Sequence, residues 1–200
     1  AHVPVVAAVG MLAGAPWPWA TGGAAAIAAA ATGFWLAAGA APSARYVLGV
    51  CLMAMPALIV FELAGHPWQI DAHMYFFAAL AILTALCDWR TILVATVTVA
   101  THHLVLNFAM PAAVFPEGSF GRVLVHAGVV AVEAAGLLWL TFRLNATLGQ
   151  SERAVAEAER AREEAESADG RRREAERRAE RERKEALAEI ADRFEREVGQ

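Results

Sequence analysis

The hydrophobic pattern divides the chain into long apolar stretches and a charged tail. Each apolar stretch approaches the length of about 20 residues that a helix needs to cross a hydrocarbon layer, and short turns separate the stretches. The first stretch is short for a complete crossing. The pattern therefore predicts an all-α, polytopic transmembrane bundle of about six spans over residues 1–144. The predicted spans are Val3–Ala15, Thr21–Ala38, Tyr46–Ala64, Asp71–Cys87, Thr91–Met110 and Arg122–Leu144.

The pattern changes after Leu144, and residues 145–200 predict one long charged helix. Alanines follow one another in alternate steps of four and three residues, which is typical of a coiled-coil seam. Gly170 interrupts this seam. We expect a cytoplasmic coiled coil that joins two copies of the chain and begins a signalling helix. A single solvated helix held by charge pairs is the alternative. The seam residues are Ala154, Ala158, Ala161, Ala165 and Ala168.

Charge is distributed as unevenly as hydrophobicity. Nine charged residues precede Gln150 and 29 follow it, so a mean hydropathy of +0.40 and a net charge of −4 average two unlike parts. Acidic residues dilute the basic clusters of the tail, which argues against nucleic acid as a partner and leaves membrane lipid. Arg45, Arg90 and Arg143 flank alternate turns. The positive-inside tendency then puts these turns and the tail in the cytoplasm.

Ionisable side chains inside predicted spans are the candidates for function, because burying them in lipid is costly. Five of the six histidines lie between Leu63 and Glu133. We expect imidazoles of different spans to converge in the external half of the bundle. Such a cluster suits a copper or zinc ion, or haem b held by paired histidines. The candidate ligands are His73, His103, His126, His102 and His66. The candidate supporting or ligand-binding residues are Glu62, Asp71, Asn107, Glu133, Met74 and Met110.

Other interpretations of these polar residues stay open. The histidines of the fifth span could form hydrogen bonds between helices, and Glu133 could be a structural acid or part of a proton-responsive or small-molecule pocket. A retinal Schiff base needs a lysine inside the membrane, and the only lysine is Lys184 in the tail. The sequence has no phosphate-binding glycine loop and no nucleophile elbow. We expect a protein that is not an enzyme; a catalytic metal or haem site formed by the histidines, and a plain membrane anchor, are lower-ranked alternatives.

Two segments resemble the bacterial methyl-accepting chemotaxis proteins. The run L-A-E-I-A-D-R-F-E-R-E-V-G (Leu187–Gly199), after an Ala/Arg/Glu-rich connector, resembles the entry into their signalling helix. The run G-H-P-W-Q-I-D-A-H-M-Y-F-F-A-A-L (Gly65–Leu80), together with D-W-R and H-H-L-V-L-N, resembles the multi-span sensor region of some of these receptors.

The resemblance implies the input module of a chemoreceptor in the bacterial inner membrane. Its methylation helices and kinase-contacting tip are absent from the sequence, so we expect a piece of a longer protein that reaches a chemotaxis kinase and adaptor through a missing region. Two alternatives are kept. The same sensor region could serve a histidine kinase or a diguanylate cyclase, or the chain could be a membrane haem or metal electron-transfer protein.

Overall fold

The computed structural model describes residues 2–198, and every regular element in this part of the chain is helical. Between residues 2 and 198, five helical segments are long and apolar enough to cross a membrane. The all-α class is confirmed, whereas the number of membrane spans stays a prediction. The first predicted span, Val3–Ala15, is not among the five segments, because α1 (His2–Ala13) has only 12 residues. The five segments are α2 (Trp17–Ala38), α3 (Pro42–Glu62), Gln69–Leu86, α6 (Trp89–Ala109) and the apolar part of α7 (Phe120–Val198). Gly199 and Gln200, the last two residues of the predicted charged helix, lie outside the described residues.

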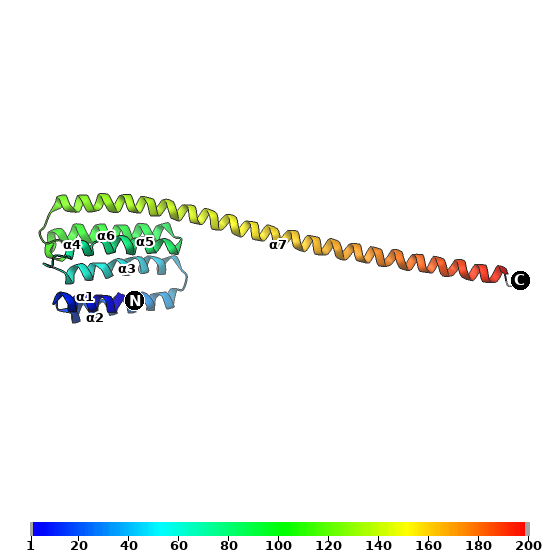
Figure 1. Ribbon diagram of the computed structural model, residues 1–200, viewed down its shortest axis with the longest axis horizontal. Coiled ribbons are helices and arrows are strands. Elements are labelled where there is room, and N and C mark those ends of the chain that lie inside the picture. Colours follow the sequence, from blue (N-terminus) through cyan, green and yellow to red (C-terminus); the bar gives the residue numbers. More distant parts are fainter. Residues whose placement is uncertain (1, 199–200) are drawn as a thin grey trace. The chain divides into compact units, whose positions relative to one another are not determined.

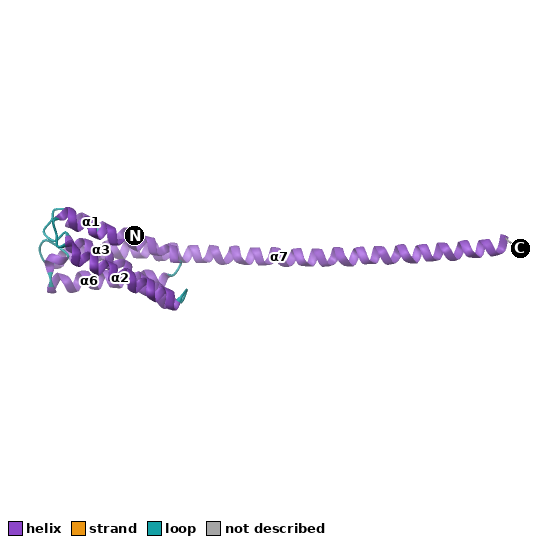
Figure 2. Ribbon diagram, turned by 90° about the horizontal axis from the view of Figure 1, so that it is seen from below, coloured by secondary structure: helices purple, strands orange, loops and turns teal. Residues whose placement is uncertain are grey.

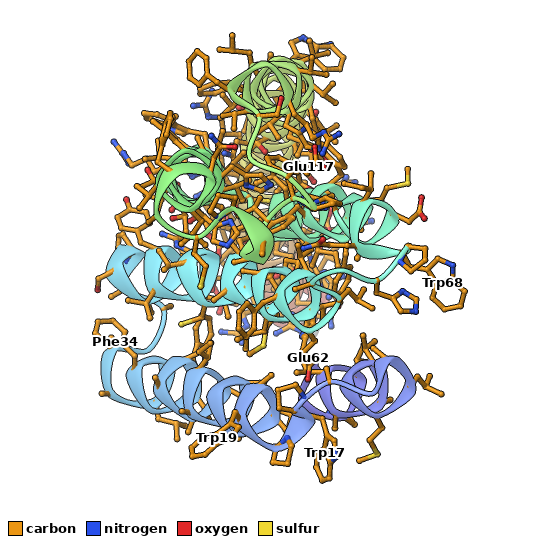
Figure 3. All side chains as sticks on the ribbon, turned by 90° about the vertical axis from the view of Figure 1, so that its left-hand side faces the viewer. Trp17, Trp19, Phe34, Glu62, Trp68 and Glu117 are labelled. Carbon is orange, nitrogen blue, oxygen red and sulfur yellow. The ribbon has the colours of Figure 1, made fainter. Side chains whose placement is uncertain are left out.

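The contacts divide the chain into two units, the first ending at Ala146 and the second beginning at Thr147. The helices of the first unit lie side by side (Figure 1), and α3 has contacts with α1, α2 and α6. Seen from one end of this unit, α1 and α2 form a layer on one side of α3, while α6 and the first part of α7 lie on the other side (Figure 3). The first unit is thus a layered helical bundle.

The span predicted over Asp71–Cys87 is divided into shorter pieces. It consists of α4 (Gln69–Ala72), α5 (Met74–Ile82) and the 3-10 helix η1 (Leu83–Leu86). At the junction of α4 and α5, the backbone N–H of His73 donates to the carbonyl of Ile70 at 3.1 Å, so the chain is wound more tightly there than in an α-helix. This junction places the His73 side chain at the start of α5.

Polar contacts hold α3, α6 and α7 together at the end of the bundle opposite to this junction. Asp88 caps α6, because its Oδ1 accepts from the N–H of Arg90 at 3.0 Å. Its Oδ2 lies 3.2 Å from Nε of Arg45 on α3, an ion-pair distance, although that N–H is not directed at the oxygen. Nδ2 of Asn145 donates to the carbonyl of Cys87 at 2.9 Å. These contacts set how α6 and α7 lie along each other.

The apolar core of the first unit joins α3, α5 and α6. Met53, Phe76, Leu80 and Ile92 are nearly or fully buried in it, and α7 contributes Val130. The backbones of α3 and α6 approach closely at Gly49, where an added Cβ would lie 3.2 Å from Cγ2 of Thr91. Close packing fixes the rotation of α6 about its axis. It therefore decides which α6 side chains face α5 and α7.

The second unit is the charged part of α7. Figure 2 shows α7 without a loop, and the helix continues through Gly170, so this residue does not break it. Ion pairs between residues four apart support the helix, each contributing about 0.3–0.5 kcal/mol. The pairing of two tails through the alanine seam stays a prediction. The ion pairs are Arg162–Glu166, Asp169–Arg173, Arg172–Glu176, Glu180–Lys184 and Glu189–Arg193.

Candidate site formed by three histidines

Three imidazoles from three different segments meet inside the first unit. The ring centroid of His73 lies 5.3 Å from that of His103 on α6 and 5.4 Å from that of His126 on α7, and the last two are 5.9 Å apart. His73 and His103 are almost completely buried, and His126 is half-buried. Three of the five candidate histidines thus lie together, while their role as ligands and their position in the external half of a membrane stay predictions. We call His73, His103 and His126 the histidine triad.

Helix lengths bring the triad to one level of the bundle. His103 lies six residues before the end of α6 at Ala109, and His126 lies six residues after the start of α7 at Phe120. At a rise of 1.5 Å per residue, each ring is about 9 Å from its helix end. Residues 110–119 join these two helix ends, so the rings of His103 and His126 lie at the same level of the bundle. His73 reaches them from the α4–α5 junction.

Each triad imidazole uses the same ring nitrogen for a local hydrogen bond. Nδ1 of His73, His103 and His126 lies 2.8, 3.0 and 2.9 Å from the backbone carbonyl oxygen four residues earlier. A carbonyl oxygen only accepts, so Nδ1 carries the proton in all three rings. Nε2 of a neutral imidazole is then left with a free lone pair. Nε2 of His73 is buried and has no hydrogen-bond partner among the described residues.

Aromatic rings enclose the triad. Phe115, a fully buried residue of the α6–α7 loop, stacks on His73 with a centroid distance of 5.4 Å and an angle of 6° between the planes. The same ring lies 5.1 Å from His126, and Phe76 of α5 lies 5.1 Å from His103. The guanidinium carbon of Arg122 lies 5.5 Å from the centroid of Phe115. The triad is thus shielded from water at the loop end of the bundle.

Two buried amides hold the loop that carries Phe115. Nε2 of Gln69 donates to the carbonyl of Ala112 at 2.8 Å, and Oδ1 of Asn107 accepts from the backbone N–H of Ser119 at 2.9 Å. Gln69 is completely buried. Sequence reasoning selected Asn107 but missed Gln69 and Phe115. The sequence did contain a signal for Phe115, because it is a large aromatic residue between Pro111 and Pro116 in a predicted loop.

A cavity of about 440 Å³ adjoins the triad between α5, α6 and α7. The three histidines form its polar part, and most of its other lining residues are apolar. No Asp or Glu belongs to the residues that line it. The volume falls within the range of small-molecule sites in proteins. The lining residues that belong to α6 and α7 include Thr96, Ala100, Leu104, Phe120, Leu124 and Ala127.

The structure places most of the other predicted site residues outside the triad. His102 touches its edge, with Nδ1 3.4 Å from Nδ1 of His103 and its ring 5.7 Å from Phe76. His66 lies in the α3–α4 turn, where its Nδ1 accepts from the N–H of Trp68 at 3.2 Å. His66 and the exposed Asp71 line a different cavity. Met74 and Met110 are 69% and 46% exposed, and neither lines the triad cavity. Glu133 lies two turns beyond His126 on α7, and its buried Oε2 has no hydrogen-bond partner in the part of the chain that the structure describes.

Glu62 is also separate from the triad. It ends α3 and points toward α1, whereas Trp17 and Trp19 point away from it (Figure 3). Both of its carboxyl oxygens are buried and form no hydrogen bond with the described residues. A Cβ added at Gly10 of α1 would overlap Oε1 of Glu62. Gly10 therefore provides the space for this carboxyl group between α1 and α3.

We expect Gly10→Ala to lower the free energy of unfolding by about 1–3 kcal/mol, because the added methyl overpacks this contact. The methyl would also lie 2.6 Å from Cβ of Trp17. Thermal unfolding of the detergent-solubilised protein measures the effect. Gly22→Ala is the matched control, since a Cβ there has no neighbour within 4 Å. If Gly10→Ala and Gly22→Ala both unfold at the wild-type temperature, the close contact of Gly10 with Glu62 is disproved. The double variant Gly10→Ala/Glu62→Ala should recover part of the stability that Gly10→Ala loses.

As the side chains stand, no three His, Cys, Asp or Glu residues in the described part of the chain are placed to hold a metal ion. An ion at the triad therefore requires the rings to turn. No family model matches the chain, and no curated protein or solved structure matches it either. Its function is inferred from the residues and their arrangement.

Proposed function

We propose that this chain is a transmembrane sensory input module, and that its signal enters through a transition-metal ion bound at the histidine triad. The convergence of three imidazoles with free Nε2 lone pairs is the observation that carries the proposal. Neutral imidazole binds copper, zinc, iron and nickel. Local hydrogen bonds of the other ring nitrogen are the usual support of such ligands. In the structure the carbonyls at residues 69, 99 and 122 hold the three Nδ1 atoms, and a ring that turns to bind an ion would have to remake this bond.

The size of the triad supports a single ion. The three centroid separations average about 5.5 Å, and division by √3 puts the centre of the triangle about 3.2 Å from each ring centroid. A metal–nitrogen bond of about 2.0–2.1 Å, extended to the middle of the ring, gives about 3.2 Å. An ion could therefore be bound by rotation of the rings, without movement of the helices.

Haem b fits this arrangement less well. In the nearly equilateral triangle, each ring lies about 4.8 Å from the midpoint between the other two. A porphyrin held by two of the histidines would extend roughly 4–5 Å from its iron into the space of the third ring. Haem binding would require one histidine to leave the triad. We therefore favour the single ion, and a haem spectrum is the result that would replace it.

The route from the site to the output would run along α7. This helix contains His126 and continues without interruption to Val198. An ion transmits a signal only if it binds more tightly to one of two helix arrangements. Drawing His126 toward His73 and His103 would favour one position of α7. We propose that two tails pair as a homodimer at the cytoplasmic face of a bacterial inner membrane and lead to a chemotaxis kinase and adaptor.

Metal analysis tests the input. The protein is purified in detergent with a histidine-free tag, and its metal content and absorption spectrum are measured. We expect about one transition-metal ion per chain and no Soret band. His66→Ala should keep the ion and His73→Ala should lose it, because only the second removes a triad ligand. Metal-free protein that takes up no added ion would contradict the proposal.

Spin labels test the transmission. Cys51 and Cys87 are replaced by alanine, and a label is attached to a cysteine introduced at Ser167, an exposed tail position. Distances between labels on two copies are measured by pulsed electron paramagnetic resonance, with the ion and after its removal. We expect the distribution of distances to shift, and the shift to disappear in His126→Ala. An unchanged distribution in protein that binds the ion would rule out the sensory function.

A further inference from the structure

The charges near the triad indicate which ion it takes. Its three potential ligands are neutral imidazoles, and the residues that line the adjoining cavity include no carboxylate. The nearest positive charge that contacts the enclosing rings is Arg122, over the face of Phe115. The surroundings of the triad thus offer lone pairs without negative charge.

The charge of the ion then becomes decisive. The cost of moving an ion from water into a medium of low dielectric constant rises with the square of its charge, so it is about four times larger for a divalent than for a monovalent ion. A carboxylate or thiolate ligand would offset part of this cost for a divalent ion. Neither group lines this cavity, since Cys51 and Cys87 lie elsewhere on α3 and after η1.

The number of ligands points in the same direction. Zinc in proteins is almost always four-coordinate, with water or substrate in the fourth position when the protein supplies three ligands. Phe115 covers the triad on the side of His73, and Phe76 covers it on the side of His103. His102 is the nearest additional imidazole. Its ring contacts those of His103 and Phe76, which lie at one edge of the triad. The described protein groups thus offer three ligands, and a fourth could come only from the adjoining cavity.

We infer that the triad binds Cu(I), held by Nε2 of His73, His103 and His126. This inference rests on the proposed metal site and names its ion. Cu(I) is monovalent, is stable with three ligands and accepts soft or imidazole donors. An uncharged triad in apolar surroundings favours it over Zn(II) and Cu(II).

Competition titrations test the inference. Reduced protein, purified without a histidine tag, is titrated anaerobically with Cu(I) against a chromophoric Cu(I) chelator, and separately with Zn(II) against a Zn(II) chelator. We expect one Cu(I) per chain and a dissociation constant at least a hundredfold below that for Zn(II). His66→Ala should bind Cu(I) as the wild type does, because His66 lies outside the triad.

A change of ligand separates the two kinds of ion. His126→Met replaces an imidazole by a soft thioether, which Cu(I) accepts and Zn(II) does not. We expect Cu(I) affinity to stay within about tenfold of the wild type, and any Zn(II) binding to fall by a hundredfold or more. Circular dichroism and thermal unfolding show whether the variant is folded.

The outcomes distinguish the inference from the proposed function. Zn(II) bound as tightly as Cu(I), with the loss of both in His73→Ala, would overturn Cu(I) selectivity and leave the metal-sensing proposal standing. A folded His126→Met variant that loses Cu(I) a hundredfold would also overturn the inference. Failure of every ion to bind the wild type would remove both.

Discussion

His103→Ala is expected to lower the affinity of the triad for its ion by at least a hundredfold. His103 is almost completely buried, with rings of His73, His126, Phe76 and Phe115 around it. Loss of an outer hydrogen-bond partner already costs a metal site 10–100-fold in affinity, so loss of one of three ligands should cost at least the upper end of that range. Equilibrium competition with a chelator measures the change.

The matched variants for this prediction are His103→Gln and His66→Ala. His103→Gln keeps a polar side chain of similar length in the buried position, so it distinguishes loss of an imidazole ligand from collapse of the fold. We expect it to unfold near the wild-type temperature and to bind the ion as weakly as His103→Ala. If both His103 variants are folded and bind as the wild type does, the histidines act only as hydrogen-bonding groups between helices.

Phe115→Ala is expected to cause the largest loss of stability, about 3–5 kcal/mol in the free energy of unfolding. The ring is fully buried, stacks on His73 and contacts the other two triad imidazoles. Truncation of a buried phenylalanine removes apolar contacts and leaves a cavity, and costs of this size are usual. Chemical or thermal unfolding in detergent measures the loss.

Phe108→Ala is the control, because this ring is 69% exposed on the bundle surface and its removal should cost well under 1 kcal/mol. Phe115→Leu should lie between the two, since it refills part of the cavity. Equal stabilities of Phe115→Ala and Phe108→Ala would show that the loop does not cover the triad as described. Increased solvent access to His73 in Phe115→Ala, detected by hydrogen exchange of the imidazole, would support its role as a cover.

Several features of the fold could be predicted because they depend on local properties of the chain. Apolar length predicts α2, α3 and α6, and prolines together with a positive-φ Gly39 place the turn between α2 and α3. Heptad-like spacing of alanines and paired charges predict a long charged helix after Leu144. The division of the fourth span at His73 was not foreseen, because apolar composition does not show where hydrogen bonding changes from i−4 to i−3.

The candidate site, too, has features that the sequence predicts and features that only the tertiary structure reveals. The sequence alone determined that His103 shares a helix face with Asn107, which follows from the helical repeat. It also placed His126 near the start of the next apolar span, after a loop marked by proline and glycine. Only the tertiary structure decided that His73 completes the triad, that Phe115 and Gln69 enclose it, and that Glu62 belongs to the contact of α3 with α1. The reason is physical: periodicity fixes the direction of a side chain about its own helix axis, whereas packing between helices fixes which axes are neighbours and at what level their side chains meet.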